Sequence, residues 1–193
     1  MDNVLPYDGF AYYYGKVFSL ADAQRWLERL LVGVEWRNDE VIMLGKRIVT
    51  KRKTAWYGDR DYLYTYSSVG RRALGWTSEL QEVKARVEEV SGVAYNSCLL
   101  NLYHDGAEGM SWHSDDEKEL EPGGAIASVS FGAERRFQFK HKRTGEVVEL
   151  LLEAGSLLVM GGVCQTHWLH ALPKTKKVGS PRVNLTFRTI LDL

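Results

Sequence analysis

From Tyr95 onward the sequence consists of short strand-forming runs separated by glycines, and this pattern limits the possible folds more than any other feature. The runs are expected near residues 95–103, 111–115, 125–131, 135–141, 146–152, 156–160 and 182–190. A turn at 143–146 and glycines at 123–124, 155 and 161–162 separate them. About seven strands at this spacing predict two packed sheets, as in a jelly roll.

Two helices are expected before these strands. Ser19 can cap a helix whose apolar residues recur at helical spacing, namely Leu20, Ala23, Leu27, Leu30 and Leu31. A second helix is expected to start after Thr77 or Ser78, with Gln81 placed for a capping box on Ser78, and to end at Gly92. Its buried stripe would be Leu80, Val83, Val87 and Val90. The predicted fold class is α+β, mainly β: a double-stranded β-helix (jelly roll) backed by N-terminal helices.

The length and composition favour a single domain over 1–193, because 193 residues with 45% apolar content can bury one substantial core. Within it, 1–92 is expected to be an N-terminal extension and 93–193 the jelly-roll core. Lys+Arg and Asp+Glu number 25 each, so no overall charge attracts the chain to nucleic acid or membrane. Basic runs at 46–53, 135–143 and 174–177 could neutralise phosphates. Solvated strand edges explain any one of these runs equally well.

The cysteines and the N-terminus indicate an intracellular protein. Cys98 and Cys164 have neither disulfide-framework nor metal-ligand spacing, and the segment after Met1 does not resemble a secretory signal. No stretch approaches the roughly 18 apolar residues of a membrane span. We therefore expect no membrane association, and a location in the cytoplasm and nucleoid of a bacterium or in the nucleus of a eukaryote.

A candidate metal site begins at His113-Ser114-Asp115. In a strand, residues two apart point to the same face, so His113 and Asp115 would present an imidazole and a carboxylate together. Two imidazoles and one carboxylate form the facial triad of non-haem iron(II) enzymes. His167 and His170 both compete for the third position. Alone, a His-x-Asp tripeptide is a weak signal, because most are polar surface residues.

The strand expected at 182–188 makes the metal interpretation stronger. Its alternation places Arg182, Asn184, Thr186 and Arg188 on one face and Val183, Leu185 and Phe187 on the other. Asn101 and Tyr103 share a face on another expected strand. Two guanidinium groups with an amide and a phenol can bind a dicarboxylate co-substrate, although an outer sheet face with solvated arginines also alternates in this way. Six strand residues span about 20 Å, so both arginines reach one small molecule only if the strand twists or their side chains converge.

At these residues the chain resembles the AlkB family, the iron- and 2-oxoglutarate-dependent nucleic-acid dealkylases, and the resemblance extends over most of the chain. The most similar segments are NLYHDGAEGMSWHSDDE (101–117), ASVSFGAERRFQFKHK (127–142), GSLLVMGG (155–162), and THWLHALPK with PRVNLTFR (within 166–188). The spacing of Tyr57-Gly58-Asp59 and Tyr64-Thr65-Tyr66-Ser67 is most similar to the branch that repairs alkylated bases in DNA.

The resemblance implies the residues that bind iron and the co-substrates 2-oxoglutarate and O2. It implies iron(II) ligation, and thus catalysis, by His113, Asp115 and His170, the histidine directly before Ala171-Leu172-Pro173. It assigns the 2-oxoglutarate pocket to Asn101, Tyr103, Arg182, Asn184, Thr186 and Arg188. Arg182 with Tyr103 would hold the distal carboxylate, and Arg188 would lie nearer the metal.

The resemblance also implies substrate contacts within the N-terminal extension, which would carry nucleotide-recognition hairpins. The residues concerned are Leu44, Gly45, Lys46, Arg52, Tyr64, Tyr66 and, outside the extension, Asp116. Leu44-Gly45-Lys46 would be the tip of a hairpin that probes the duplex, Arg52 would contact the backbone near the lesion, and the tyrosines would stack on a flipped base. An ordinary exposed hairpin and ordinary tyrosines remain the alternatives. The chain departs from the commoner family pattern at His104, where arginine is frequent.

The implied function is oxidative dealkylation of 1-methyladenine and 3-methylcytosine in DNA, with etheno adducts as further candidates. The reaction would release succinate, carbon dioxide and an aldehyde. An RNA demethylase or a protein hydroxylase of the same chemistry is the nearest alternative, and a non-catalytic nucleic-acid-binding module is a second. A cupin-like metal enzyme without a keto acid leaves the arginine face unexplained. The expected partner is alkylated DNA, with RNA as the alternative, and the expected state is a monomer.

Overall fold

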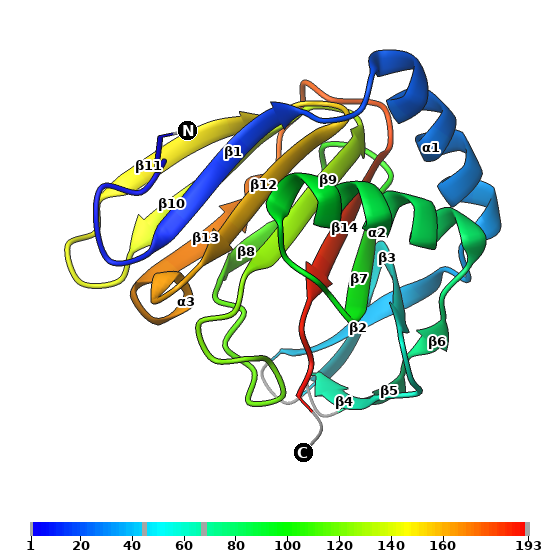
Figure 1. Cartoon of the computed structure of the whole chain (residues 1–193), viewed down its shortest axis with the longest axis horizontal. Helices are drawn as coiled ribbons and strands as arrows, with labels where there is room; N and C mark the ends of the chain where they lie inside the picture. Colours follow the sequence, from blue (N-terminus) through cyan, green and yellow to red (C-terminus); the bar gives the residue numbers. More distant parts are fainter. Residues whose placement is uncertain (1, 44–45, 67–68, 192–193) are drawn as a thin grey trace.

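The computed structural model describes residues 2–43, 46–66 and 69–191, and only the backbone of 41–43, 46–47, 63–66 and 69–71. Two β-sheets face each other in a jelly roll, and two helices cover the outer face of the larger sheet (Figure 1). The fold therefore has three layers, and the space between the two sheets is where a jelly roll holds its ligands.

The larger sheet has eight strands and is antiparallel along its main path. Its order is β1 (Phe10–Lys16), β12 (Ser156–Gly161), β9 (Ile126–Gly132), β14 (Arg182–Arg188), β7 (Ser97–Tyr103), β3 (Lys46–Gly58) and β2 (Arg37–Met43), with β6 (Leu74–Gly75) parallel to β3. Strand β14 pairs with β9 on one side and β7 on the other, so that Asn184 lies between Ser130 and Asn101. This register places the polar residues of three strands in one row.

The smaller sheet supplies the opposite wall. Its order is β11 (Val147–Leu152), β10 (Arg135–His141), β13 (Trp168–Leu172) and β8 (Met110–His113). His170 of β13 pairs directly with His113 of β8. A short helix, α3 (Cys164–His167), precedes β13, and β4 (Leu63–Tyr66) pairs with β5 (Val69–Arg72) in a separate two-stranded sheet.

Helices α1 (Leu20–Gly33) and α2 (Ser78–Ser91) form as their apolar spacing predicts. Ser19 caps α1 by accepting a hydrogen bond from the Asp22 amide. The N-cap of α2 is Thr77, whose hydroxyl accepts a hydrogen bond from the Leu80 amide, and the predicted capping box of Gln81 on Ser78 is therefore wrong. Gly92 ends the helix in the left-handed conformation, as expected.

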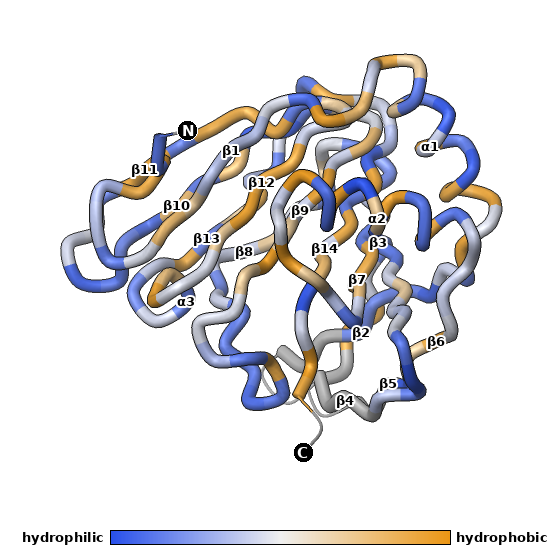
Figure 2. Tube along the Cα trace, in the orientation of Figure 1, coloured by the Kyte–Doolittle hydropathy of each residue, from blue (hydrophilic) through white to orange (hydrophobic). Residues whose placement is uncertain are grey.

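Two apolar clusters hold the layers together. The larger lies between the helices and the larger sheet, and its helical members include Trp26, Leu30, Leu80 and Val83. Figure 2 shows hydrophobic and hydrophilic residues alternating along these helices, as expected when one face is buried. The second cluster lies between the two sheets around Trp168. No helix in the described ranges has both the length and the apolarity needed to cross a bilayer.

The seven expected strands are all present, with ends within two residues of the prediction. The strand expected at 111–115 ends at His113, so Asp115 lies in the loop that follows it. Periodicity did not assign β13 or the six strands before α2, but the hairpin with its tip at 44–46 that the family resemblance implies corresponds to the antiparallel pair β2 and β3. Strands β1 and β3 pair with the core strands β12 and β7, β2 pairs with β3, and all three extend the larger sheet.

Candidate functional site

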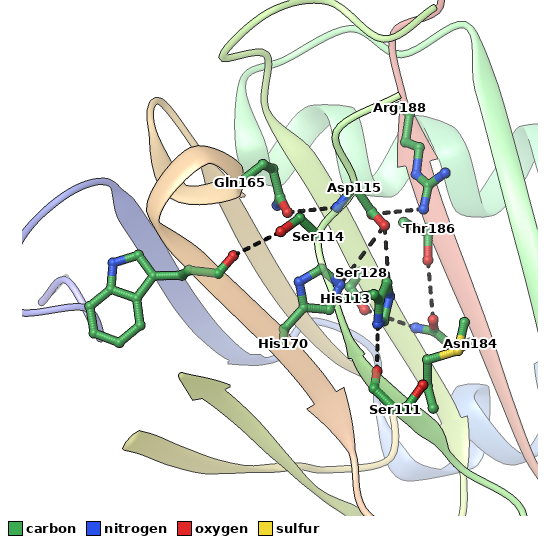
Figure 3. A network of polar contacts seen from close by, with 12 residues as sticks. Ser111, His113, Ser114, Asp115, Ser128, Gln165, His170, Asn184, Thr186 and Arg188 are labelled. Carbon is green, nitrogen blue, oxygen red and sulfur yellow. Dashed lines mark hydrogen bonds and ion pairs between the residues drawn. The ribbon is translucent and has the colours of Figure 1, made fainter. Parts of the chain in front are cut away.

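Three side chains from two strands and a loop converge between the sheets. The ligand atoms of His113, Asp115 and His170 all lie within 4.8 Å of one another. Asp115 Oδ1 is 3.8 Å from His113 Nε2 and 3.9 Å from His170 Nε2, and the imidazole ring centroids are 4.2 Å apart. Figure 3 shows the three side chains pointing toward a common position. This donor set suits iron(II) and would leave further coordination positions open.

The loop after β8 is anchored where it carries Asp115. The Asp115 amide donates to Gln165 Oε1 at 2.9 Å, and Ser114 Oγ donates to the Trp168 carbonyl at 3.2 Å (Figure 3). Both partners belong to the α3–β13 segment, which also carries His170. Gln165 was not predicted, because a contact made 50 residues away along the chain leaves no local sequence signal.

The protonation states also favour a metal. His113 Nδ1 lies 2.8 Å from the Ser111 carbonyl, which can only accept, so Nδ1 donates to it and Nε2 is the nitrogen left to face a metal. Burial lowers the pKa of His170 to about 3, so that imidazole is neutral. Burial by itself would raise the pKa of Asp115, but the charge of Arg188 outweighs it, with smaller contributions from the two histidines, and lowers that pKa. The site thus offers two imidazole nitrogens and a carboxylate.

His167 belongs to a different group, with Asp8 and His141, whose ligand atoms also lie within 4.8 Å of one another. Here the Thr144 amide donates to His141 Nδ1 at 3.1 Å, so His141 Nε2 carries the proton and donates to Asp8 Oδ2 at 3.1 Å. The atom that would bind a metal therefore already holds a hydrogen. This arrangement ties the N-terminal segment to β10, and we assign it no metal.

A cavity of about 380 Å³ extends from the three ligands along the inner face of the larger sheet. Its polar lining contains every residue that the sequence assigned to the co-substrate: Asn101, Tyr103, Arg182, Asn184, Thr186 and Arg188. Both arginines thus reach one cavity despite the length of strand between them. The rest of the lining is an apolar wall that the sequence did not predict. Met110, Phe137 and Leu172 contribute to it from the smaller sheet, and Trp56, Leu99, Met160 and Ile190 from the larger sheet and the segment after β14.

The two arginines occupy different ends of this cavity. Arg188 Nη2 donates to Asp115 Oδ2 at 2.7 Å, which places its guanidinium beside the metal ligands. The Arg182 guanidinium lies 5.5 Å from the Tyr103 ring centroid, and its Nη2 donates to Ser130 Oγ at 2.9 Å. Burial lowers the pKa of Arg182 to about 10, so the group remains cationic at neutral pH.

Between the arginines, Asn184 and Thr186 hold each other in place. Asn184 Nδ2 donates to Ser128 Oγ at 2.8 Å and to the Val129 carbonyl at 2.9 Å, while its Oδ1 accepts from Thr186 Oγ1. Asn184 therefore braces β14 against β9, and most of its hydrogen-bonding capacity is already used.

The cavity also holds buried polar atoms that await a ligand. Among the described residues, Asn101 Oδ1 and Arg182 Nε are buried and have no hydrogen-bond partner. Such atoms are costly unless a ligand or water satisfies them. An amide and a guanidinium at one end, with the three metal ligands at the other, fit a keto acid that carries a second carboxylate.

The residues assigned to the nucleic acid are placed less completely. Leu44 and Gly45 lie outside the described residues, as do the side chains of Lys46, Tyr64 and Tyr66. Asp116 is exposed and lines the cavity, as a residue that contacts a bound base would.

Arg52 does not lie on the surface, contrary to a contact with the DNA backbone. It is only 6% exposed, and Asp39 forms an ion pair with it in the cavity wall. Its Nη1 also contacts Met110 Sδ at 3.1 Å. A basic run in the sequence gave no sign of this inward-facing arginine, because its buried acidic partner comes from the neighbouring strand β2.

Known proteins are similar to this chain in sequence and in fold. Residues 10–188 match the 2OG-Fe(II) oxygenase superfamily. The DNA oxidative demethylase ALKBH2 of Mus musculus is 44% identical over 195 residues, which cover 95% of this chain and 82% of that protein. ALKBH2 of Homo sapiens is 42% identical, covering 92% and 72%. Alpha-ketoglutarate-dependent dioxygenase alkB homolog 3 of Mus musculus is 36% identical, covering 98% and 67%.

A solved structure gives the same fold at low identity. The structure of OsALKBH1 superposes with a TM-score of 0.64 at 14% identity, covering 96% of this chain and 98% of that one. This likeness concerns the architecture alone.

Proposed function

The chain belongs to the 2OG-Fe(II) oxygenase superfamily, and on this basis we propose that it repairs N-alkylated bases in DNA by oxidative dealkylation. Its cofactor is iron(II), and its co-substrates are 2-oxoglutarate and O2. When bound, these supply the oxidation of an alkyl carbon, coupled to decarboxylation of the keto acid to succinate and carbon dioxide. The hydroxylated N-alkyl group is a hemiaminal, which breaks down to an aldehyde and the unmodified base.

The side chains of this protein position the reactants. His113, Asp115 and His170 would hold the metal, and Arg182 would hold the distal carboxylate of 2-oxoglutarate with Tyr103. Arg188 keeps Asp115 ionised and fixes its orientation. The apolar wall limits water around the reacting carbon, so the groups meet in a fixed geometry.

On the substrate side, Asp116 would contact the base, which is supported by its exposure and its position in the cavity lining. The favoured lesions are 1-methyladenine and 3-methylcytosine, with etheno adducts as further candidates, because a base that cannot pair is less costly to flip out of the duplex. The proposal is supported by Arg188, which joins the metal ligands and the arginine-lined cavity into one site, and by relatives named as DNA demethylases.

The test is an assay of purified protein with iron(II), 2-oxoglutarate and an oligonucleotide containing 1-methyladenine. We expect formaldehyde and succinate in equal amounts, and loss of both in His113→Ala and His170→Ala with loss of bound iron. His167→Ala is the matched control and should retain iron, because its ring lies in the other histidine group. Absence of turnover on alkylated DNA by iron-loaded wild-type protein would reject the proposal.

Side-by-side assays on methylated RNA and on peptides separate the remaining alternatives. We propose that RNA is at most a secondary substrate, because the relatives named as demethylases at 42–44% identity act on DNA by name. Faster turnover of methylated RNA than of the matched DNA would reverse this order. Turnover of 2-oxoglutarate that stops in His113→Ala would exclude a purely binding module.

A further inference from the structure

Arg52 and Asp39 form a buried ion pair that the proposed reaction leaves without a role. The two residues are 6% and 1% exposed, and both line the cavity. Removing two charges from water costs several kcal/mol for each, so such a pair adds little stability compared with apolar side chains of the same size. An ion pair between β2 and β3 could form on the surface without this cost. Its position in the cavity wall therefore requires an explanation other than stability.

An irregularity in the β2–β3 ladder accompanies the inward position of Arg52. Asp39 of β2 faces three residues of β3, 50–52, where a regular ladder would place one. Asn38 Nδ2 donates to the Thr50 carbonyl at 2.9 Å, and Thr50 Oγ1 donates to the Arg52 carbonyl at 3.2 Å. These hydrogen bonds hold the bulge in place. Bulges of this kind commonly redirect a side chain beside an active site.

Arg52 contacts one of the residues assigned to the distal carboxylate of the keto acid. Tyr103 of β7 pairs with Arg182 of β14, and β3, which carries Arg52, pairs with the other edge of β7. The Tyr103 ring centroid lies 5.5 Å from the Arg182 guanidinium and 5.9 Å from the Arg52 guanidinium. The ring is thus flanked by two cations from neighbouring strands, each at a distance that favours cation–π attraction.

The Arg52 guanidinium is itself held from both sheets. Its Nη2 is paired with Asp39 of the larger sheet, and its Nη1 lies 3.1 Å from Sδ of Met110, which belongs to β8 of the smaller sheet. Because the Asp39 carboxylate compensates its charge, Arg52 adds little net charge to the cavity. Its effect on a bound anion therefore depends mainly on its contact with Tyr103.

We propose that Asp39 and Arg52 are positioning residues that hold the Tyr103 ring in place for the distal carboxylate of the keto acid. Arg182 and the Tyr103 hydroxyl make the direct contacts, and Arg52 fixes the orientation of the ring from its other side. The N-terminal extension, which supplies β2 and β3, thus completes the co-substrate pocket. The inference rests on the 2-oxoglutarate dependence of the proposed function and is independent of the nucleic-acid substrate.

The test measures binding of two keto acids that differ at the far end. Anaerobic titration of the iron(II) protein, followed by the visible charge-transfer band, gives a Kd for 2-oxoglutarate and for 2-oxopentanoate, which lacks the distal carboxylate. In Arg52→Met we expect the Kd for 2-oxoglutarate to rise about tenfold, about 1.4 kcal/mol. The Kd for 2-oxopentanoate should change less than about threefold on the same scale. Equal weakening of both keto acids would overturn the proposal, because it would show a general structural role.

Tyr103→Phe shows whether Arg52 acts through the tyrosine. This variant keeps the ring and removes the hydroxyl, so the orientation of the ring matters less to the carboxylate. Adding Arg52→Met to Tyr103→Phe should therefore change the Kd for 2-oxoglutarate less than about threefold. A rise of about tenfold in both backgrounds would mean that the two residues act independently, and the proposal would be wrong.

Lys51→Met is the matched control, because it removes a positive charge from an exposed residue of the same strand. It should leave both Kd values unchanged. Should Arg52→Met fail to fold because the buried Asp39 carboxylate loses its partner, the double variant Asp39→Asn/Arg52→Met removes both charges. A rise of about tenfold in the Kd for 2-oxoglutarate in this double variant supports the proposal, and wild-type affinity contradicts it.

Failure of this inference and failure of the proposed function give different results. Wild-type protein that shows no charge-transfer band with 2-oxoglutarate would contradict the proposed function, and this inference with it. A wild-type band whose Kd does not change in Arg52→Met would contradict this inference alone. Because no alkylated DNA is present, absence of repair activity would leave the result unaffected.

Discussion

Arg188 and Asp115 form the contact through which the metal ligands and the co-substrate pocket become one site. The 2.7 Å hydrogen bond joins β14 of the larger sheet to the loop after β8 of the smaller one. Without the guanidinium, burial would favour the neutral form of Asp115, which is a poor metal ligand. The residue thus orients a ligand and keeps it charged.

His170 makes the metal-free protein sensitive to acid. Its pKa is about 3 in the folded state because of burial, against 6.5 for the free side chain. Between these values the unfolded chain binds more protons, so stability is present above about pH 6.5 and declines as the pH falls. Lowering the pH from 7 to 5 should destabilise the wild type more than His170→Gln, by up to about 2 kcal/mol.

Urea unfolding of the chelator-treated proteins at both pH values measures this difference. Asp115 does not confound it, because a carboxyl with a lowered pKa contributes stability that is lost only below about pH 4. Equal losses in wild type and His170→Gln would show that His170 takes up its proton in the folded state.

At the scale of the elements, substitutions at the start of α2 test which residue caps its first turn. The Thr77 hydroxyl accepts the Leu80 amide at 3.3 Å, whereas the Ser78 hydroxyl contacts only the exposed Glu79 carboxylate. Thr77→Ala should lower the free energy of unfolding by about 1 kcal/mol, and Ser78→Ala by less than about 0.5 kcal/mol. Thermal or urea denaturation measures the stability lost in each variant. A larger loss for Ser78→Ala would show that Ser78 is the N-cap, as the sequence predicted.

The elements also show where sequence patterns succeed and where they fail. Strand β14 was predictable because its apolar residues face the helices while its polar ones face the cavity, which gives a clean period of two. Periodicity did not assign strand β3, because Arg52, Thr54 and Trp56 line the cavity and place polar residues where a core face is expected. Strand β13 is a short, mostly apolar run, Trp168–Leu172, which periodicity does not assign.

The candidate site was likewise only partly predictable from the sequence. His113, Asp115 and the arginines of β14 were identifiable from residue type and spacing, and the family resemblance decided between His167 and His170. The contact of Gln165 joins distant segments of the chain, and the Asp39–Arg52 pair joins the facing strands β2 and β3. Local sequence carries no record of such contacts.

At the scale of the whole molecule, β1 covers the edge of the larger sheet that β12 would otherwise expose. It pairs with β12 along Phe10–Lys16, and Leu5 and Ala11 complete the apolar cluster between the sheets. Removing residues 1–16 should expose the β12 edge, lower the unfolding temperature and cause association in size-exclusion chromatography, whereas we expect the intact chain to elute as a monomer.

Lys16→Gln is the control for that deletion. It breaks only a half-exposed ion pair with Glu153 at 3.0 Å, so stability should change by less than about 1 kcal/mol. A truncated chain that stays monomeric with an unchanged unfolding temperature would show that β12 needs no partner at this edge.

The central position of β14 has a consequence for how the protein is made. It is the last strand in chain order among those described, yet the groups β1-β12-β9 and β7-β3-β2 are joined only through it. During translation these groups lack the strand that joins them in the larger sheet until residues 182–188 emerge from the ribosome, and the same seven residues carry both arginines of the cavity. The larger sheet is therefore completed in the same step that supplies both arginines, and a nascent chain that lacks β14 should not bind the keto acid.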